Sequence, residues 1–290
     1  MQWFLFLLLP CYLFSFQKVT YTFSSEPIDV VIPYHPKDFE TIEMCIDGIR
    51  KNGRNIGRII VISKERYTDS AEWFDEKNYP FTKEDLALEI FHGDAEKARE
   101  FLASPVTRIG WIYQQLLKLY APFVIPGISS NVLILDADVI YLKSAEFMTS
   151  TGQPIFIIGS NDTKEYFEHM AKLLPGLHRA NPEQSGIVHH MLFQRPVLED
   201  LFGLISEYHR TEPWRAICQS VDLGEIYKSC VSEYEIYFNF VQLRTHQKIL
   251  RRIFWTEVVS DVSDISYYKR AGYVFIASQE WYRRWCKQTP

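Results

Sequence analysis

The chain has 290 residues, of which 47% are hydrophobic and 15% aromatic, so it has enough apolar material to bury the core of a folded domain. Its formal net charge of −5 does not predict a broad basic surface, and we expect no nucleic-acid partner. The five cysteines form no C-x-x-C pair, which argues against a zinc site or a disulfide framework and indicates ordinary buried thiols.

The N-terminal segment is far more apolar than the rest of the chain. Residues 3–16 are interrupted only by Pro10, Cys11 and Ser15, a length typical of a signal-peptide core but short for a bilayer span. No Lys or Arg precedes them, and a hydrophobic first strand is the alternative. We interpret residues 1–24 as a signal-like or membrane-anchor segment and residues 25–290 as the folded domain. An exported or membrane-associated protein is favoured over a cytoplasmic one.

After this segment the chain alternates between short apolar runs and helical periodicity. Residues 28–33 and 58–63 are rich in Val and Ile, which predicts two buried strands. Residues 37–52 between them have apolar side chains near helical spacing, and Gly53 follows. A strand, a helix and a strand at this spacing indicate a βαβ unit and a mostly parallel sheet.

The next part of the chain predicts a short strand over residues 87–91 and helices over 94–103 and 110–121. On the last helix Gln114 and Lys118 are four residues apart and share the face opposite the apolar side chains. These two residues either form a solvated stripe or present Lys118 to a phosphate. The second alternative arises because the helix leads directly into the central motif.

The central motif is Asp136-Ala137-Asp138, which follows a run of apolar residues. We predict one strand over residues 131–142 with both carboxylates on the same face, because residues two apart in a strand share a face. Two buried anions repel each other and are poorly solvated, whereas a hard divalent cation between them makes the arrangement favourable. The motif therefore predicts a metal site at Asp136 and Asp138.

A pair of histidines follows in a predicted strand over residues 185–193. His189 and His190 are adjacent, so their side chains point to opposite faces and only one of them can face a given site. His189 is a candidate cofactor-binding residue, and a histidine satisfied within the core is the alternative.

A last candidate lies at the start of a helix predicted over residues 232–243. Ser232 and Glu235 have the spacing of a capping box, which explains Glu235 without any functional role. Glu233 is not needed for that cap, and the helix dipole stabilises a carboxylate at this position. Glu233 is therefore a candidate catalytic base or acceptor-orienting group, and His246 follows just beyond the helix.

Five segments, taken in order, resemble a little-characterised family of nucleotide-sugar glycosyltransferases with the GT-A fold. They are residues 28–34, 111–120 (W-x-Y-Q-Q-L-L-K-L-Y), 132–138, 185–193 and 232–241. The resemblance covers about residues 27–285. It implies an α/β fold, a GT-A-like single domain with a mostly parallel central sheet flanked by helices.

The resemblance implies a metal-dependent, hexosyltransferase-like enzyme that moves a sugar from a nucleoside-diphosphate sugar to a glycan, lipid or other acceptor. A divalent cation, Mn²⁺ or Mg²⁺, would bridge the diphosphate and the aspartates. Asp138 would coordinate this cation directly, whereas Asp136 would hold the ribose or act on the metal through water. Pro33 and Tyr34 would hold the nucleotide base.

The resemblance leaves the third protein ligand open. Many such enzymes use a C-terminal histidine, but this chain has Ser278-Gln279-Glu280 in the corresponding region. His246 is the remaining candidate. Glu233, from its place at the start of its helix, and Asp136 are the candidate catalytic residues.

Two other functions are compatible with the same residues. A haloacid-dehalogenase-like phosphatase also carries Asp-x-Asp at a strand end, but usually on its first strand and before Gly-Thr, where this chain has Val139-Ile140. A non-catalytic carbohydrate-binding protein would suit the aromatic content.

Overall fold

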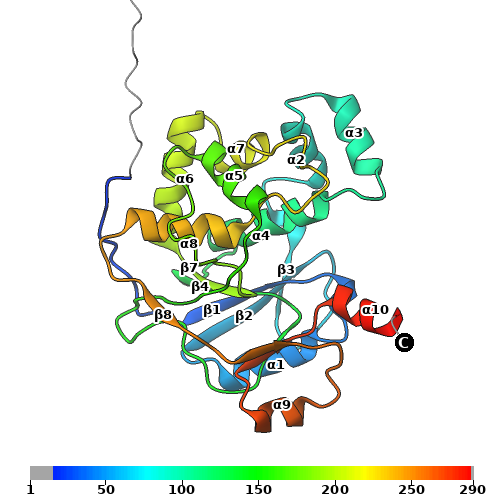
Figure 1. Cartoon of the computed structure of the whole chain (residues 1–290), viewed down its shortest axis with the longest axis vertical. Coiled ribbons are helices and arrows are strands. Elements are labelled where there is room, and N and C mark those ends of the chain that lie inside the picture. Colours follow the sequence, from blue (N-terminus) through cyan, green and yellow to red (C-terminus); the bar gives the residue numbers. More distant parts are fainter. Residues whose placement is uncertain (1–15, 289–290) are drawn as a thin grey trace, which may run out of the picture.

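The computed structural model describes residues 16–288, and a five-stranded sheet crosses its centre (Figure 1). The strand order is β3-β2-β1-β4-β7, with the first four strands parallel and β7 antiparallel to β4. A small sheet has the order β5-β10-β9, and β6 pairs with β8. The strands are β1 Ile28–Pro33, β2 Ile56–Ser63, β3 Glu72–Asp75, β4 Asn131–Leu135, β5 Val139–Tyr141, β6 Ile155–Ile157, β7 His190–Gln194, β8 Leu250–Arg252, β9 Thr256–Val258 and β10 Phe275–Ala277.

Helices cover both faces of the central sheet (Figure 1). Two short 3₁₀ turns, η1 (Pro36–Asp38) and η2 (Glu76–Asn78), follow β1 and β3. The α-helices in the described residues are α1 Ile42–Asn52, α2 Lys83–Ile90, α3 Ala95–Ala103, α4 Ile109–Val124, α5 Lys164–Leu173, α6 Arg195–His209, α7 Pro213–Gln219, α8 Glu233–Arg244, α9 Ile265–Ala271 and α10 Glu280–Gln288. This architecture confirms the predicted α/β class, with a mostly parallel central sheet flanked by helices.

The central strands are buried on both faces, as their continuous apolar runs predict. Val31 and Ile134 point into a core shared with α2, α4, α6, α7 and α8. Ile32 and Leu135, their neighbours in sequence, point into a second core shared with α1 and β10. Burying apolar side chains on both faces fixes the register of each strand, because a one-residue slip would exchange the two cores.

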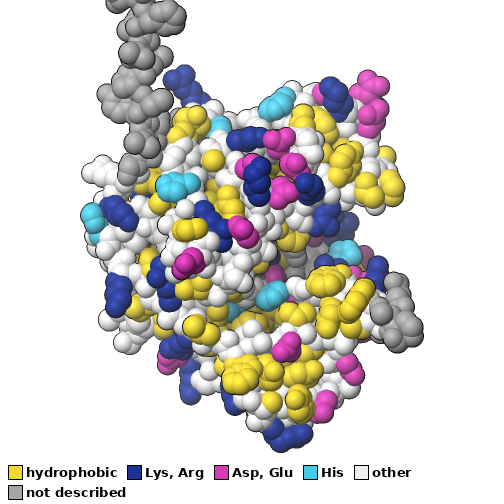
Figure 2. Space-filling view, viewed as in Figure 1, with side chains coloured by type: hydrophobic (Ala, Val, Ile, Leu, Met, Phe, Trp, Pro, Cys, Tyr) yellow, Lys and Arg dark blue, Asp and Glu magenta, His cyan; other side chains and the backbone are white. Residues whose placement is uncertain are grey.

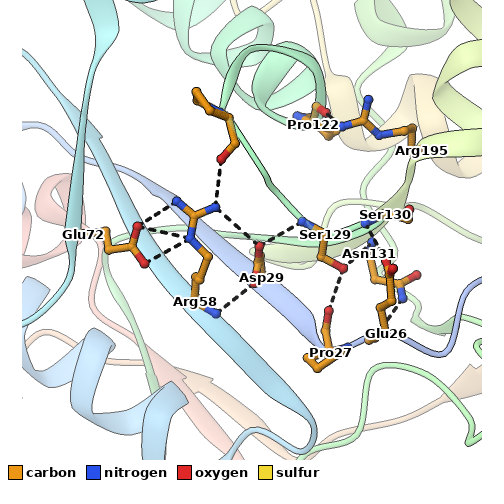
Figure 3. Close-up of polar contacts among 11 residues, drawn as sticks. Glu26, Pro27, Asp29, Arg58, Glu72, Pro122, Ser129, Ser130, Asn131 and Arg195 are labelled. Atoms are coloured by element: carbon orange, nitrogen blue, oxygen red, sulfur yellow. Dashed lines mark hydrogen bonds and ion pairs between the residues drawn. The ribbon is translucent and has the colours of Figure 1, made fainter.

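A network of polar contacts ties the strands together at the end of the sheet where β1 and β4 begin (Figure 3). The buried Asp29 carboxylate accepts hydrogen bonds from the backbone N–H groups of Arg58 (2.8 Å) and Ser129 (2.9 Å). The Arg58 guanidinium in turn bonds Glu72 on β3 and the Pro126 carbonyl. Asp29 therefore links β1, β2 and the loop before β4, so its role in the described residues is structural.

Two local predictions are wrong. The strand predicted over residues 87–91 is part of helix α2, whose capping box joins Thr82 and Asp85; a short apolar run alone does not distinguish a strand from a buried helical turn. Helix α4 does not end before Pro122 but continues to Val124. Proline removes only one N–H donor there, in the last turn of the helix.

Residues 16–24, which we grouped with the N-terminal segment, run along the domain. Val19 forms a parallel bridge with Thr245, and the buried Tyr21 donates a hydrogen bond to Asp200 (2.6 Å). Residues 1–15, which carry most of the predicted signal-like segment, lie outside the described residues. The boundary at residue 25 and the exported location stay predictions. Within residues 16–288 no helix is both long and apolar enough to cross a bilayer.

Candidate active site

A cavity of about 500 Å³ lies where β1 and β4 end, opposite the Asp29 network. Ligand sites of α/β sheets commonly lie at the carboxyl ends of the strands. Its walls come from η1, α4, the turn after β4, the segment before β7, the start of α8 and the start of α10. Figure 2 shows the surface hollowed between the helical layer and the C-terminal part of the chain.

The central motif lies in a turn rather than in a strand. The chain leaves the main sheet after Leu135, and β5 pairs with β10 in the small sheet, so the single strand predicted over residues 131–142 is wrong. Aspartate is a poor strand former, which is consistent with a break at this point. Backbone hydrogen bonds hold the turn: Asp136 donates to the His189 carbonyl (3.0 Å), and Ser278 donates to the Asp138 carbonyl (2.8 Å). The two carboxylates are thus positioned by both sheets.

A buried lysine joins two carboxylates in the cavity wall. Lys118 Nζ lies 2.7 Å from Asp136 Oδ1 and 2.7 Å from Glu233 Oε1, and it lies 4.5 Å from the centre of the Tyr234 ring. Burial opposes charge on Lys118, but the two carboxylates outweigh it and raise the lysine pKa well above its usual value. The lysine therefore stays charged and fixes both acids.

The acids respond differently to this environment. Burial opposes ionisation of Asp136, but Lys118 and His189 outweigh it and lower the Asp136 pKa. Burial raises the pKa of Glu233, and Lys118 only partly offsets this effect. Burial and the neighbouring Asp136 charge raise the pKa of Asp138. Asp136 is therefore the matched anion, whereas Asp138, like Glu233, lacks sufficient positive charge nearby.

Asp136, Asp138 and His189 form a group that could hold a metal ion. One ligand atom from each lies within 4.8 Å of the others, and His189 Nδ1 is 3.7 Å from Asp136 Oδ2. Asp138 Oδ1 is fully enclosed and has no hydrogen-bond donor among residues 16–288. Carboxylate oxygens with an imidazole nitrogen suit Mn²⁺ or a similar divalent cation, so the residues present fit the predicted metal.

His189 reaches this group through an unusual backbone conformation. Its φ is +66°, a left-handed value that is uncommon for residues other than glycine, and such strain concentrates at functional sites. His190 points away from the cavity and packs edge-on against Tyr141 and Phe275 in the core. The expectation that only one of the two histidines faces the site therefore agrees with their placement.

Other predicted site residues are placed as follows. Gln114 lines the cavity with Lys118. Pro33 is the last residue of β1 and Tyr34 follows it, at the same edge of the sheet as the cavity. Neither residue lines the cavity, and the Tyr34 ring contacts that of Tyr67. His246 is exposed and lies beside Val19, outside the metal-ligand group, so the structure brings His189 there instead.

The Glu235 side chain bonds residues elsewhere in the fold and does not bond back to the helix N-terminus, as a capping box would require. Ser232 accepts a hydrogen bond from the Glu235 backbone N–H, as predicted (3.2 Å). The Glu235 side chain, however, bonds Ser185, the Gly186 N–H and Asn239. It thereby fixes the segment that precedes His189.

The sequence analysis did not single out several cavity residues. Lys37 and Asp38 lie in η1, which we predicted as part of a helix, and burial raises the pKa of Asp38 to about 6. Arg108 precedes α4, and Tyr166 lies on α5. In contrast to these four residues, Trp111 had a signal in the sequence, because it begins one of the family-like segments.

A second hollow of about 610 Å³ lies near the other end of β2, and several arginines line it. Two of these cations already have partners, since Arg58 pairs with Glu72 and Arg66 with Asp69, and the Arg50 guanidinium bonds the Ser70 carbonyl. Because most of its charge is paired within the fold, this hollow is a weaker candidate than the cavity beside Asp138.

Comparisons with known proteins come from sequence and from structure. No curated protein matches the chain significantly. Among solved structures, the apo crystal structure of mouse xyloside xylosyltransferase 1 is similar, with a TM-score of 0.40 and 10% identity over 88% of this chain and 98% of that one. The sequence pattern of the family of unknown function DUF6492 matches residues 22–288. The chain therefore belongs to the DUF6492 family.

Proposed function

We propose that this chain is a metal-dependent glycosyltransferase that moves a hexose or similar sugar from a nucleoside diphosphate to a glycan, lipid-linked or other acceptor. The observation that carries the proposal is the Asp138 carboxylate, whose Oδ1 is enclosed without a donor beside Asp136 and His189. An enclosed carboxylate oxygen without a partner is costly, and a divalent cation would satisfy it.

The residues at this end of the cavity would divide the work. Asp138 and His189 would hold the cation, whereas Asp136 has one oxygen bonded to Lys118 and the other toward His189. Lys37 lines the same cavity and makes no ion pair among the described residues, which leaves its charge for a diphosphate. When bound, the cation would neutralise charge that develops on the leaving nucleoside diphosphate.

Glu233 is the proposed base for the acceptor hydroxyl. It is 1% exposed and lines the cavity at the N-terminus of α8. Burial raises its pKa, which makes the carboxylate a better proton acceptor than an exposed glutamate. A base on the acceptor side implies inversion of the anomeric configuration.

The nucleotide base is proposed to lie beside Tyr34. The Tyr34 and Tyr67 rings are 5.0 Å apart at the end of β1, and Tyr67 is exposed. An accessible aromatic ring at this sheet edge offers a stacking surface next to the proposed diphosphate position.

Thermal shift with UDP and GDP, each with and without Mn²⁺, tests this function. We expect one nucleotide to stabilise the wild type only when Mn²⁺ is present, and Asp138→Ala to abolish the shift. Asp69→Ala, at a side chain that is 93% exposed, is the matched control and should respond as the wild type does.

Two outcomes would contradict the proposal. Absence of any nucleotide response in the wild type would exclude the metal-diphosphate site, as would an equal response in Asp138→Ala. Metal-independent binding of a sugar, with no hydrolysis of sugar nucleotides, would favour the non-catalytic binding protein instead.

A further inference from the structure

One face of α4 connects two ends of the cavity. Trp111, Gln114 and Lys118 lie three or four residues apart, so they share this face, and all three line the cavity. Trp111 and Lys118 are seven residues apart, which corresponds to about 10 Å along the helix. The cavity therefore extends well beyond the proposed metal site at the Lys118 end.

The far end has a rigid aromatic wall. The rings of Trp111 and Tyr166 are parallel within 6°, with centres 6.5 Å apart. Trp111 Nε1 donates to the Val231 carbonyl (2.7 Å), and Tyr166 is buried on α5. Since the orientation of Trp111 is fixed by this bond, the part of its side chain that lines the cavity can contact the C–H groups of a sugar without further ordering.

Arg108 places a positive charge beside this wall. Its guanidinium lies 5.5 Å from the centre of the Trp111 ring and donates a hydrogen bond to the Ser229 hydroxyl. Within residues 16–288 it makes no ion pair, in contrast to Arg58 and Arg215. A guanidinium can bind a carboxylate or phosphate through two parallel hydrogen bonds, so Arg108 has capacity for an anionic ligand.

Glu233 connects the two ends. It bonds Lys118 at 2.7 Å, and its charge acts on Tyr166, as does that of Arg108. Lys118 also bonds Asp136 at 2.7 Å, so Glu233 lies beside the metal-ligand end of the cavity. A sugar against Trp111 would thus lie along α4 from Glu233 and from the metal ligands, because Trp111 and Lys118 are seven residues apart on this helix.

We propose that this end is an acceptor subsite for an anionic sugar: the sugar packs against the cavity-lining part of Trp111, and Arg108 binds a carboxylate or phosphate group of that sugar. Gln114, whose side chain makes no hydrogen bond within the described residues, is available to an acceptor hydroxyl. This inference rests on the proposed glycosyltransferase function, because it assigns the acceptor of that reaction.

Calorimetry with three matched aryl glycosides tests the subsite. The probes are 4-nitrophenyl β-D-glucoside, the corresponding glucuronide and the corresponding 6-phosphoglucoside, measured with Mn²⁺ and a saturating concentration of whichever of UDP and GDP stabilises the wild type, so that the nucleotide end is filled. We expect at least one anionic glycoside to bind the wild type about tenfold more tightly than the neutral glucoside. Whether the glucuronide or the phosphoglucoside binds better identifies the anionic group.

Variants separate charge from stacking. Arg108→Gln should abolish the preference for the anionic probe, Arg108→Lys should retain part of it, and Trp111→Leu should weaken all three probes. Arg99→Gln is the matched control, since Arg99 is exposed and bonds only the Ala95 carbonyl of its own helix.

These outcomes distinguish failure of the acceptor subsite from failure of the proposed function on which it rests. If UDP or GDP, together with Mn²⁺, stabilises the wild type and Arg108→Gln but the anionic preference is absent or persists in Arg108→Gln, the acceptor subsite is wrong and the proposed function stands. The same conclusion follows if none of the glycosides binds. If neither nucleotide with Mn²⁺ has any effect on the wild type, both proposals fail.

Discussion

Asp29 and Asp138 lie at opposite ends of the same sheet and differ in how the fold treats their charge. Each Asp29 carboxylate oxygen accepts a backbone N–H, from Arg58 and from Ser129. Asp138 Oδ1 is enclosed without a donor from the described part of the chain, and burial together with Asp136 raises the Asp138 pKa. The satisfied carboxylate holds strands together, whereas the unsatisfied one has capacity for a ligand. Burial alone therefore does not identify a functional acid; its remaining hydrogen-bonding capacity does.

The largest stability effect is expected at Lys118, the cation between the two acids. Lys118→Met would leave the Asp136 and Glu233 carboxylates uncompensated, and we expect a loss of about 3–5 kcal/mol in the free energy of unfolding. Urea denaturation at neutral pH measures it. The double variant Lys118→Met/Glu233→Gln should recover part of the loss, and no recovery would show that the two side chains are not coupled.

Asp29→Ala should destabilise the chain through the opposite end of the sheet. The N–H groups of Arg58 and Ser129 would lose their acceptor, at a cost of roughly 2–3 kcal/mol. Glu72→Ala is the control; it removes a partly exposed pair with Arg58 and should cost less than about 1 kcal/mol. Nucleotide affinity should be unchanged in both variants. Loss of nucleotide binding in folded Asp29→Ala would contradict the independence of the two ends of the sheet.

A buried histidine makes the stability of the fold depend on pH. His169 is buried with Nε2 at 2.9 Å from the Ile217 carbonyl, and burial lowers its pKa to about 4. Because the unfolded state protonates first, this stabilisation is present above about pH 6.5 and is lost as the pH falls toward 4.

Denaturation at pH 7, 6 and 5 should show the free energy of unfolding falling with pH. In His169→Gln this loss between pH 6.5 and 4 should be smaller by on the order of 2 kcal/mol. His190, whose pKa burial lowers to about 3, leaves a residual slope of the same sign. An unchanged pH slope in the variant would contradict the assignment.

Asp138→Asn should have the smallest effect on stability, and its sign should be opposite to that of Asp29→Ala. Without metal, the substitution removes repulsion from Asp136, so we expect the free energy of unfolding to rise by about 1 kcal/mol. Denaturation in the presence of a chelator measures it. Destabilisation comparable to that of Asp29→Ala would mean that Asp138 is a structural acid.

Sequence patterns predicted the parts of the fold that local periodicity determines. The apolar runs of β1 and β2 and the amphipathic spacing of α4 each identified an element. The break after Leu135 was missed because it depends on the pairing of β5 with β10, which are more than 130 residues apart. Similarly, the spacing of Ser232 and Glu235 predicted the helix start but not the bond from Glu235 to Ser185.

The candidate site was predictable only where chemistry is concentrated in a short motif. Asp136 and Asp138 provided such a signal, and Lys118 followed from its helix. Arg108 and Lys37 carry no local pattern, since their importance lies in their place in the cavity wall and in the absence of an ion-pair partner among the residues that the structure describes. His189 could not be preferred over His246 because its position depends on a left-handed backbone conformation.

Direct Mn²⁺ binding tests the central claim, that Asp138 lacks a partner because it is a metal ligand. Electron paramagnetic resonance of free Mn²⁺ should show one bound ion per chain in the wild type, with tighter binding when UDP is added. Asp138→Asn and His189→Gln should each weaken this binding, whereas Asp29→Asn should leave it unchanged in the folded protein. Equal Mn²⁺ binding by the wild type and Asp138→Asn, with or without UDP, would contradict the account.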